Sequence, residues 1–292
     1  MKLKDIGEDA VVEEITRKLR FDERVEIGPG DDCAVVRWGD NLQLLKTDCV
    51  IEGIHFLPDA PARAVGWKAL CRNISDIAAM GGDPLDAVVT VAVSPDRELA
   101  WLTDLYAGLN QAATKYGINL VGGETSRSPG PAFISVALTG KVEKERLVTR
   151  SGGKIGDRLY VTGKLGGSLQ GKHLSFEPRL AESSWLTQNF QVHAMIDLSD
   201  GLGSDLPRLA TASGIGFEID LSALPKNEGC SEEQALTDGE DYELLFAVSN
   251  DIGLKLEGEW NEAFPDLALT CIGRLTEEKG EAIRRRGYDH FR

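Results

Sequence analysis

Six short acidic motifs occur along this chain, each at a predicted turn or at the end of a predicted element. They are Gly30-Asp31-Asp32, Thr47-Asp48, Ser75-Asp76, Gly122-Gly123-Glu124-Thr125, Asp197-Leu198-Ser199-Asp200-Gly201 and Asp238-Gly239-Glu240-Asp241. Carboxylates beside glycines suit hard cations, and Mg²⁺ in particular is usually held by a few carboxylates together with substrate phosphates. A magnesium-dependent enzyme that acts on phosphates is therefore the first hypothesis.

Each motif taken alone has a simpler interpretation. Gly-Asp pairs and the Gly-Gly-Glu-Thr stretch at 122–125 suit tight turns, and the pairs at 47–48 and 75–76 suit turns or helix caps. Asp76 differs because it falls inside an apolar helical segment, where a buried carboxylate needs a partner. The partner can be a cation or a nearby arginine such as Arg72. Asp205, by contrast, is expected to be a solvated acid at a helix start.

One further stretch, 166–173, nearly spells a phosphate-binding Walker A loop after a predicted strand. That motif needs Ser or Thr after its lysine to reach Mg²⁺, and His173 stands there instead. We therefore expect a helix start opened by glycines rather than a working phosphate loop. Such a helix start can still direct backbone amides at an anion.

The composition limits the classes of partner and compartment. The chain has 292 residues, with 47 Asp and Glu against 32 Lys and Arg, and its formal net charge of −15 argues against nucleic acid as a partner. Five scattered cysteines favour reduced thiols over disulfides or zinc. The N-terminal stretch is too acidic for a signal peptide, and no apolar run approaches the length of a membrane span. We expect a soluble cytoplasmic protein with no membrane contact.

The elements that must position these motifs alternate between helices and strands. The periodicity predicts an opening helix to about residue 19, helices over 64–80 and 99–116, and strands over 33–36, 42–46, 86–93, 118–121 and 133–142. The second half offers helices after Gly166 and Gly201 and strands over 158–162, 217–219, 242–248 and 269–272. Residues 171–195 give no clear pattern. The fold class is α/β (mixed α+β), with two domains expected at 1–148 and 149–292.

With these motifs assembled, the chain resembles the thiamine-monophosphate kinase family, within the superfamily of aminoimidazole ribonucleotide synthetase and selenophosphate synthetase. The resemblance is collinear from Gly28 to Phe291. It is carried by the strings GDDCA at 30–34, TDCVIEGIHF at 47–56, NISDIAAMGGDP at 73–84, TRSG at 149–152, IDLSDGL at 196–202, GEDYEL at 239–244 and GYDHF at 287–291.

The resemblance implies ATP-dependent phosphorylation of thiamine monophosphate to thiamine diphosphate, with several Mg²⁺ ions. It implies a homodimer whose N-terminal sheets pair into a barrel. The implied metal ligands are Asp32, Thr47, Asp48, Asp76, Glu124, Asp197 and Asp200, and no residue is implied as a catalytic acid or base. The implied ATP contacts are Tyr106, Gly123, Glu124, Arg150 and Ser199. The implied substrate contacts are His55, Glu240 and Arg285.

Three positions depart from the family pattern. Glu124 stands where the family usually has aspartate. Lys46 stands where a small residue commonly offers an oxygen to a metal, so either one magnesium site is lost or the lysine points away. Arg285 stands where members often place a tryptophan against the thiamine. The alternatives are another ATP-dependent phosphoryl-transfer enzyme of the superfamily and a non-catalytic nucleotide-binding dimer.

Overall fold

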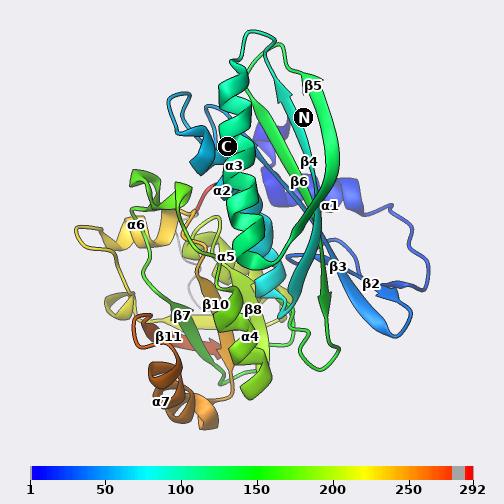
Figure 1. The fold of residues 1–292 in the computed structure, drawn as a ribbon. Coiled ribbons are helices and arrows are strands. Elements are labelled where there is room, and N and C mark those ends of the chain that lie inside the picture. Colours follow the sequence, from blue (N-terminus) through cyan, green and yellow to red (C-terminus); the bar gives the residue numbers. More distant parts are fainter. Residues whose placement is uncertain (1, 278–286, 292) are drawn as a thin grey trace.

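A computed structural model describes residues 2–277 and 287–291 of the chain, which form two β-sheets with helices packed against them (Figure 1). The first sheet has the strand order β1-β2-β3-β6-β4-β5 and the second the order β8-β10-β7-β11-β9. The strands of the first sheet are β1 (Val25–Ile27), β2 (Ala34–Trp38), β3 (Asn41–Ile51), β4 (Asp83–Val93), β5 (Asn119–Arg127) and β6 (Phe133–Val142). Those of the second are β7 (Arg158–Thr162), β8 (Val192–Asp197), β9 (Gly216–Ile219), β10 (Leu244–Val248) and β11 (Leu269–Thr276).

The first sheet is covered by helices on one face. Its strands pair antiparallel, except that β4 and β5 run parallel. Along β6 the buried residues Ile134, Val136 and Leu138 alternate with less buried ones, as expected where only one face meets the core. The strand β5 lies at the sheet edge, and none of its residues is buried. One face of this sheet and one edge are therefore left open in the single chain.

The helix α2 (Ala62–Ala79) is the element that joins the two halves. Its apolar residues Leu70, Ile74 and Ile77 recur at helical spacing and are fully buried. All but three of its 18 residues are buried, because it packs against β3, β6 and α3 (Leu99–Tyr116) and also against β8 and α4 (Leu180–Asn189). Polar side chains on this helix are consequently held at fixed positions between the sheets.

The second sheet is antiparallel throughout and has its own apolar core, formed by Leu159, Val161, Ile196, Leu245 and neighbours. The remaining helices are α1 (Glu8–Thr16), α5 (Leu202–Ala212), α6 (Glu232–Thr237) and α7 (Gly253–Ala263). Within the described residues, no helix has the length and apolar character needed to span a bilayer.

The predicted mixed α/β class is confirmed, and the predicted helices over 64–80 and 99–116 match α2 and α3 closely. Three expectations were wrong. The 122–125 stretch lies inside the edge strand β5, because its glycines form strand pairs with β4 instead of a turn. Asp48 lies inside β3 and not at its end. After Gly166 the chain forms two short 3₁₀ turns, Ser168–Gln170 and Lys172–Leu174, rather than a helix.

The predicted domain boundary near residue 149 falls between the last strand of the first sheet and the first strand of the second. The division into 1–148 and 149–292 stays a proposal, because the long helix α2 packs on strands of both halves.

Candidate active site

Three of the predicted metal ligands meet at one point between the two sheets. Asp32 precedes β2, Asp76 lies near the end of α2, and Asp197 ends β8. One carboxylate oxygen from each lies within 4.8 Å of the others, and all three side chains are buried. We call Asp32, Asp76 and Asp197 the convergent cluster.

Each acid of the convergent cluster has a polar partner on one oxygen. Arg150 donates to Asp32 Oδ1 over 2.6 Å, Lys46 Nζ to Asp76 Oδ1 over 2.7 Å, and Ser75 Oγ to Asp197 Oδ2 over 2.6 Å. The second oxygen of Asp32 is buried and has no hydrogen-bond partner within residues 2–277 and 287–291. A buried acceptor of this kind, facing two further carboxylates, is what a hard cation such as Mg²⁺ needs.

The electrostatics of the convergent cluster favour a cation. Burial and the charge of Asp32 together raise the pKa of Asp197 to about 7, although Ser75 and Lys46 lower it. Burial also raises the pKa of Asp76 well above its usual range, and Lys46 opposes this while Asp197 adds to it. Carboxylates that repel one another in this way are relieved when a divalent ion binds between them. The residues present therefore fit a magnesium site.

Side chains alternate along β3, which divides the motif at 46–48 between two faces of the sheet. Lys46 and Asp48 face α2, and their charged atoms are 3.8 Å apart. Thr47 faces the opposite side, where its hydroxyl donates to the Val136 carbonyl over 3.1 Å. Lys46 does not point away from the site, because its ammonium contacts Asp76 directly. The side chain of Thr47 is consequently separated from the convergent cluster by the strand itself.

Three charged residues at four-residue spacing form a row along α2, namely Lys68, Arg72 and Asp76. Arg72 donates to the Cys49 carbonyl over 2.8 Å, and its Nε lies 3.8 Å from Asp48 Oδ2. The side chain that donates to Asp76 is Lys46, and the suggested partner Arg72 contacts Asp48 and the Cys49 carbonyl instead.

The predicted substrate contacts His55 and Glu240 lie at the Lys68 end of that row. The fully buried Lys68 forms an ion pair with Glu240 and donates to the His55 carbonyl over 2.7 Å. Glu240 has a positive φ of 57°, and its backbone N–H donates to the Ser199 carbonyl over 2.7 Å. Burial lowers the pKa of His55 to about 3, so its ring is neutral and Nδ1 accepts from the Ile51 N–H.

Asp200 lies outside the convergent cluster and is paired with Arg208. Asp205 was expected to be solvated, and that expectation was wrong. Its side chain is 1% exposed, contacts Arg208 over 2.9 Å and accepts from the Asp200 N–H. It is buried because α5 turns its first residues toward the site.

Two predicted ATP contacts lie at the far edge of the first sheet. Two strands, β4 and β6, separate β5 from β3 in the sheet, as the pairs Gly123–Val89, Val89–Val136 and Val136–Asp48 show. Three strand spacings therefore separate Gly123 from Asp48, or about 14 Å. A Cβ on Gly123 would meet the Val89 carbonyl oxygen at 1.8 Å, so only glycine fits there. Glu124 is exposed beside it. The structure does not bring Gly123 and Glu124 to the convergent cluster of the same chain.

Tyr106 lies on α3 and is 41% exposed. Within the described residues it forms no hydrogen bond or ring contact with a predicted site residue. Arg285 lies outside the described residues.

The first two amides of the stretch that resembles a Walker A loop already bind carboxylates. The N–H groups of Gly166 and Gly167 donate to the carboxylates of Asp241 and Asp238. Close by, both oxygens of the buried Glu243 are bound by Arg179, with Lys172 and Thr162 as further donors. We call Asp241 and Glu243 the anchoring acids. The amides at 166–167 therefore stabilise the fold and are not available to a phosphate.

The sequence did not indicate the contacts of four further side chains at the site. Ser75 donates to Asp197, Lys68 pairs with Glu240, and Arg72 lies beside Asp48. The fourth is Tyr242, two residues after Glu240, whose buried hydroxyl has no hydrogen-bond partner among the described residues. The four-residue spacing of Lys68, Arg72 and Asp76 was a signal that could have identified the row, since such residues share one helix face.

Two models of known families match the chain. The AIR synthase related protein N-terminal domain matches residues 30–142, and the AIR synthase related protein C-terminal domain matches residues 162–285. Together with the two sheets and the carboxylates between them, these matches define a protein of the AIR synthase related class.

More similar relatives narrow this class. The thiamine-monophosphate kinase of Rhodopirellula baltica is 36% identical and covers 91% of this chain and 87% of that protein. That of Escherichia coli K12 is 37% identical and covers 94% of each. The solved structure of AaThiL complexed with AMPPCP and TMP has a TM-score of 0.87 at 33% identity and covers 99% of each chain. The chain belongs to the thiamine-monophosphate kinase family, as its sequence motifs predicted.

Proposed function

We propose that the protein transfers the γ-phosphoryl group of ATP to thiamine monophosphate and forms thiamine diphosphate and ADP. The observation that carries the proposal is the convergence of Asp32, Asp76 and Asp197 within 4.8 Å, with a buried unpartnered oxygen on Asp32. The activity named for the relatives and the AMPPCP and TMP in the AaThiL complex support it.

The proposed reaction needs positioning more than acid or base catalysis. The acceptor is a phosphate monoester with a second pKa near 6, so its oxygen is already anionic at neutral pH. That oxygen attacks the γ-phosphorus, a new P–O bond forms, and the bond to the bridging β,γ-oxygen breaks as ADP leaves with the electron pair. No side chain has to remove a proton.

The acidic residues have the role of holding magnesium, and the basic residues that of fixing phosphates. When bound, Mg²⁺ would supply the positive charge that neutralises the mutual repulsion of the phosphates. Asp32, Asp76 and Asp197 are proposed as its principal ligands, with Asp48 and Asp200 beside them and Thr47 and Glu124 less directly placed. Arg150 and Ser199 are proposed to contact ATP, and His55 and Glu240 the thiamine moiety.

The proposal is tested by incubating the purified protein with ATP, MgCl₂ and thiamine monophosphate and measuring thiamine diphosphate by chromatography. We expect product that depends on all three components. Nucleotide binding without product at saturating substrate would contradict the proposal and support the non-catalytic alternative. Turnover of a different phosphate acceptor in its place would support another activity of the superfamily.

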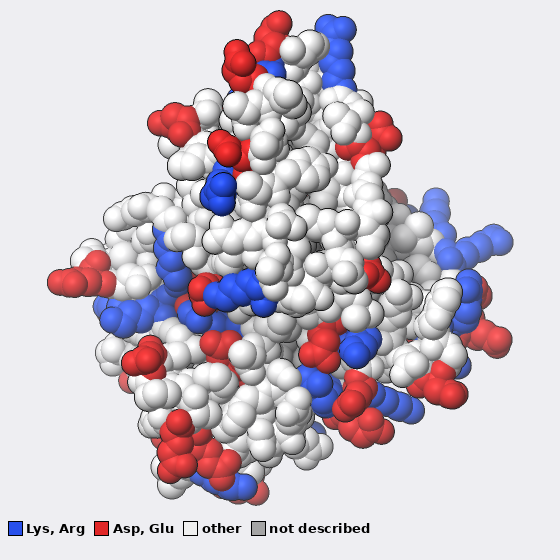
Figure 2. Space-filling model, in the orientation of Figure 1, with Lys and Arg blue, Asp and Glu red and all other residues white. Residues whose placement is uncertain are grey.

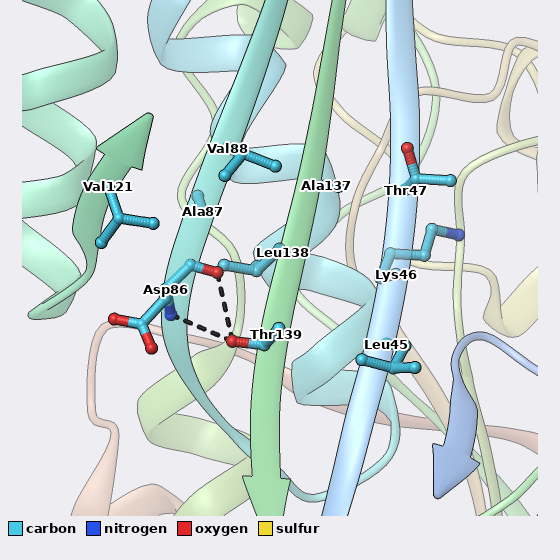
Figure 3. A pocket seen from close by; sticks show the side chains of 10 residues that line it. All are labelled: Leu45, Lys46, Thr47, Asp86, Ala87, Val88, Val121, Ala137, Leu138 and Thr139. Carbon is cyan, nitrogen blue, oxygen red and sulfur yellow. Dashed lines mark hydrogen bonds between the residues drawn. The ribbon is translucent and has the colours of Figure 1, made fainter. Parts of the chain in front are cut away.

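We also propose that the working form is a homodimer built on the open face of the first sheet. Figure 3 shows Leu45, Val88 and Val121 on three different strands of this face, around a shallow hollow that also includes Thr47 and Ala137. These three apolar side chains are 40%, 44% and 62% exposed, which is typical of a surface covered by a partner. Pairing of two such faces would also cover the edge strand β5.

A dimer of this kind offers a role for Gly123 and Glu124, which lie too far from the convergent cluster of their own chain. In the proposed dimer they serve the site of the partner. Mixing two inactive variants, Asp76→Asn and Glu124→Ala, should restore activity, because some mixed dimers contain one intact site. A monomer by light scattering, or no recovery after mixing and exchange, would contradict this arrangement.

A cytoplasmic location is proposed from the five cysteines, which are all free thiols in the structure. On the face that Figure 2 shows, acidic and basic side chains are interspersed.

A further inference from the structure

Two buried donor groups near the convergent cluster have no hydrogen-bond partner among the described residues. They are the Nε of Arg72 and the hydroxyl of Tyr242. The side chain of Arg72 is 12% exposed and Tyr242 is 2% exposed. Leaving a buried donor unpaired costs about 1–3 kcal/mol, and more for a charged group. Two such groups in one region indicate a ligand with acceptor oxygens.

The backbone holds both groups firmly. Arg72 is on the rigid helix α2, and its Nη1 donates to the Cys49 carbonyl over 2.8 Å, which fixes the guanidinium. Its Nε is 3.8 Å from Asp48 Oδ2, within range of an ion pair but too far for a hydrogen bond. Tyr242 has a positive φ of 50°, its N–H donates to the Leu198 carbonyl, and its ring stacks on Phe176 with centroids 3.9 Å apart. Neither donor can easily turn to find a partner in the protein.

Contacts of the chain place both donors between the two ends of the site. The N–H of Tyr242 donates over 2.8 Å to the carbonyl of Leu198, the residue after Asp197, and Tyr242 is two residues from Glu240, the partner of Lys68. Along α2, Arg72 is one turn, or about 6 Å, from Asp76 and the same from Lys68. Asp76 belongs to the convergent cluster, and Lys68 contacts Glu240 and His55.

We propose that Arg72 Nε and the Tyr242 hydroxyl bind the phosphate group of the acceptor, thiamine monophosphate. This inference rests on the proposed function, which places the phosphate between the convergent cluster and the thiamine contacts His55 and Glu240. A phosphate monoester offers several acceptor oxygens and nearly two negative charges at neutral pH. It would satisfy both donors and keep one oxygen directed at the convergent cluster for attack.

The carboxylates around the proposed phosphate position would repel an anion. Asp48 Oδ2 is 3.8 Å from Arg72 Nε, and Asp48 Oδ1 is 3.8 Å from Lys46 Nζ. Glu240 is the ion-pair partner of Lys68, which is one turn from Arg72 along α2. An anionic phosphate among these carboxylates is repelled unless fixed positive charge is present. Arg72 supplies that charge on the acceptor side, and Tyr242 adds a neutral donor because burial keeps its hydroxyl protonated.

The test compares two ligands that differ only by the phosphate. Dissociation constants of thiamine monophosphate and of thiamine are measured by calorimetry with AMPPCP and MgCl₂ present, for the wild type, Arg72→Gln and Tyr242→Phe. We expect each variant to bind thiamine monophosphate about 10- to 100-fold more weakly, the range for a lost bond to a charged group. Thiamine affinity should stay within about twofold, because it does not depend on phosphate contacts.

Tyr116→Phe is a matched control. Tyr116 is on α3, its ring contacts that of Trp67, and its hydroxyl is also buried without a hydrogen-bond partner among the described residues. It is not one of the residues proposed to bind metal, ATP or thiamine monophosphate. It should bind both ligands as the wild type does. An equal loss for thiamine and thiamine monophosphate in Arg72→Gln and Tyr242→Phe, or no loss for either, would overturn the inference. If the wild type itself binds thiamine monophosphate no better than thiamine and makes no thiamine diphosphate, the proposed function fails as well.

Discussion

The convergent cluster and the anchoring acids are two groups of buried carboxylates with opposite surroundings. Asp241 and Glu243 have donors on their oxygens: Asp241 accepts from the Gly166 N–H and Ser168, and Glu243 from Arg179, Lys172 and Thr162. Asp32, Asp76 and Asp197 have one polar side-chain partner each and face one another.

The difference shows how to tell a structural acid from a functional one when both belong to acidic motifs of the sequence. A carboxylate surrounded by donors stabilises the fold and has nothing left for a ligand. Carboxylates that converge with an oxygen unsatisfied destabilise the fold until a cation binds, so their retention points to function. The following predictions separate the two groups.

The largest effect is expected for Asp76→Asn, which removes a charge from the convergent cluster. Thiamine diphosphate formation should fall by about 100-fold or more, the scale for losing one preorganised electrostatic contact. The metal-free protein should unfold at the same or a higher temperature, because a buried repulsion is relieved. Rates by chromatography and melting curves by calorimetry check both parts. Retained activity would show that Asp76 does not bind the metal.

Glu243→Gln should lower the stability of the protein and leave its activity nearly unchanged, the reverse of Asp76→Asn. The change removes the acidic partner of Lys172 and the nearer of two acidic partners of Arg179, which also lies 3.6 Å from Glu182, and removing one member of a buried pair is costly. Because both cations are partly exposed, we expect a loss of about 2–3 kcal/mol in the free energy of unfolding, measured with urea. Activity of the folded protein, assayed well below its melting temperature, should stay within about threefold. A drop comparable to that of Asp76→Asn would remove the distinction between the two groups.

Magnesium should stabilise the protein through the convergent cluster alone. At a concentration 100 times the dissociation constant, a ligand that binds only the folded state adds about 2.7 kcal/mol. We expect a rise in melting temperature on adding MgCl₂ to the wild type and to Glu243→Gln. No rise is expected for Asp76→Asn, and a rise of the same size there would place the metal elsewhere.

The smallest effect is expected for Lys46→Gln. The ammonium of Lys46 occupies one oxygen of Asp76 and competes with a metal for that acid. Its removal should tighten magnesium binding severalfold, a change of about 1 kcal/mol for a partly exposed pair. Calorimetric titration of MgCl₂ measures this, with Lys141→Gln on the exposed side of β6 as the control. Weaker binding would mean that Lys46 positions Asp76 for the metal instead of competing with it.

Local patterns in the sequence predicted much of the fold. The helix over 99–116 was predicted to the residue, and the apolar spacing of Leu70, Ile74 and Ile77 located α2. The buried position of Asp76 followed from the same spacing. The glycines at 122–123 were misread because glycine favours turns, whereas here it allows β5 to approach β4 closely.

The partners of the acids could not be predicted, because they depend on contacts between distant segments. Nothing near Asp76 in sequence indicates that Lys46, 30 residues earlier, will contact it, since that depends on the side-chain alternation of β3 against α2. Asp205 looked solvated for the same reason, as local sequence carries no information on its burial against Arg208 and Asp200. The motifs gave seven candidate metal ligands, and the structure was required to show that Asp32, Asp76 and Asp197 converge and that one oxygen of Asp32 has no hydrogen-bond partner among the described residues.

The most direct test compares thiamine diphosphate formation by the wild type, Asp76→Asn and Glu243→Gln at saturating ATP, MgCl₂ and thiamine monophosphate. All three are assayed at a temperature where calorimetry shows them folded. The account predicts product from the wild type and from Glu243→Gln, and almost none from Asp76→Asn. Product from Asp76→Asn at the wild-type rate, or its absence from the wild type, would contradict the assignment of the convergent cluster as the metal-assisted site of phosphoryl transfer.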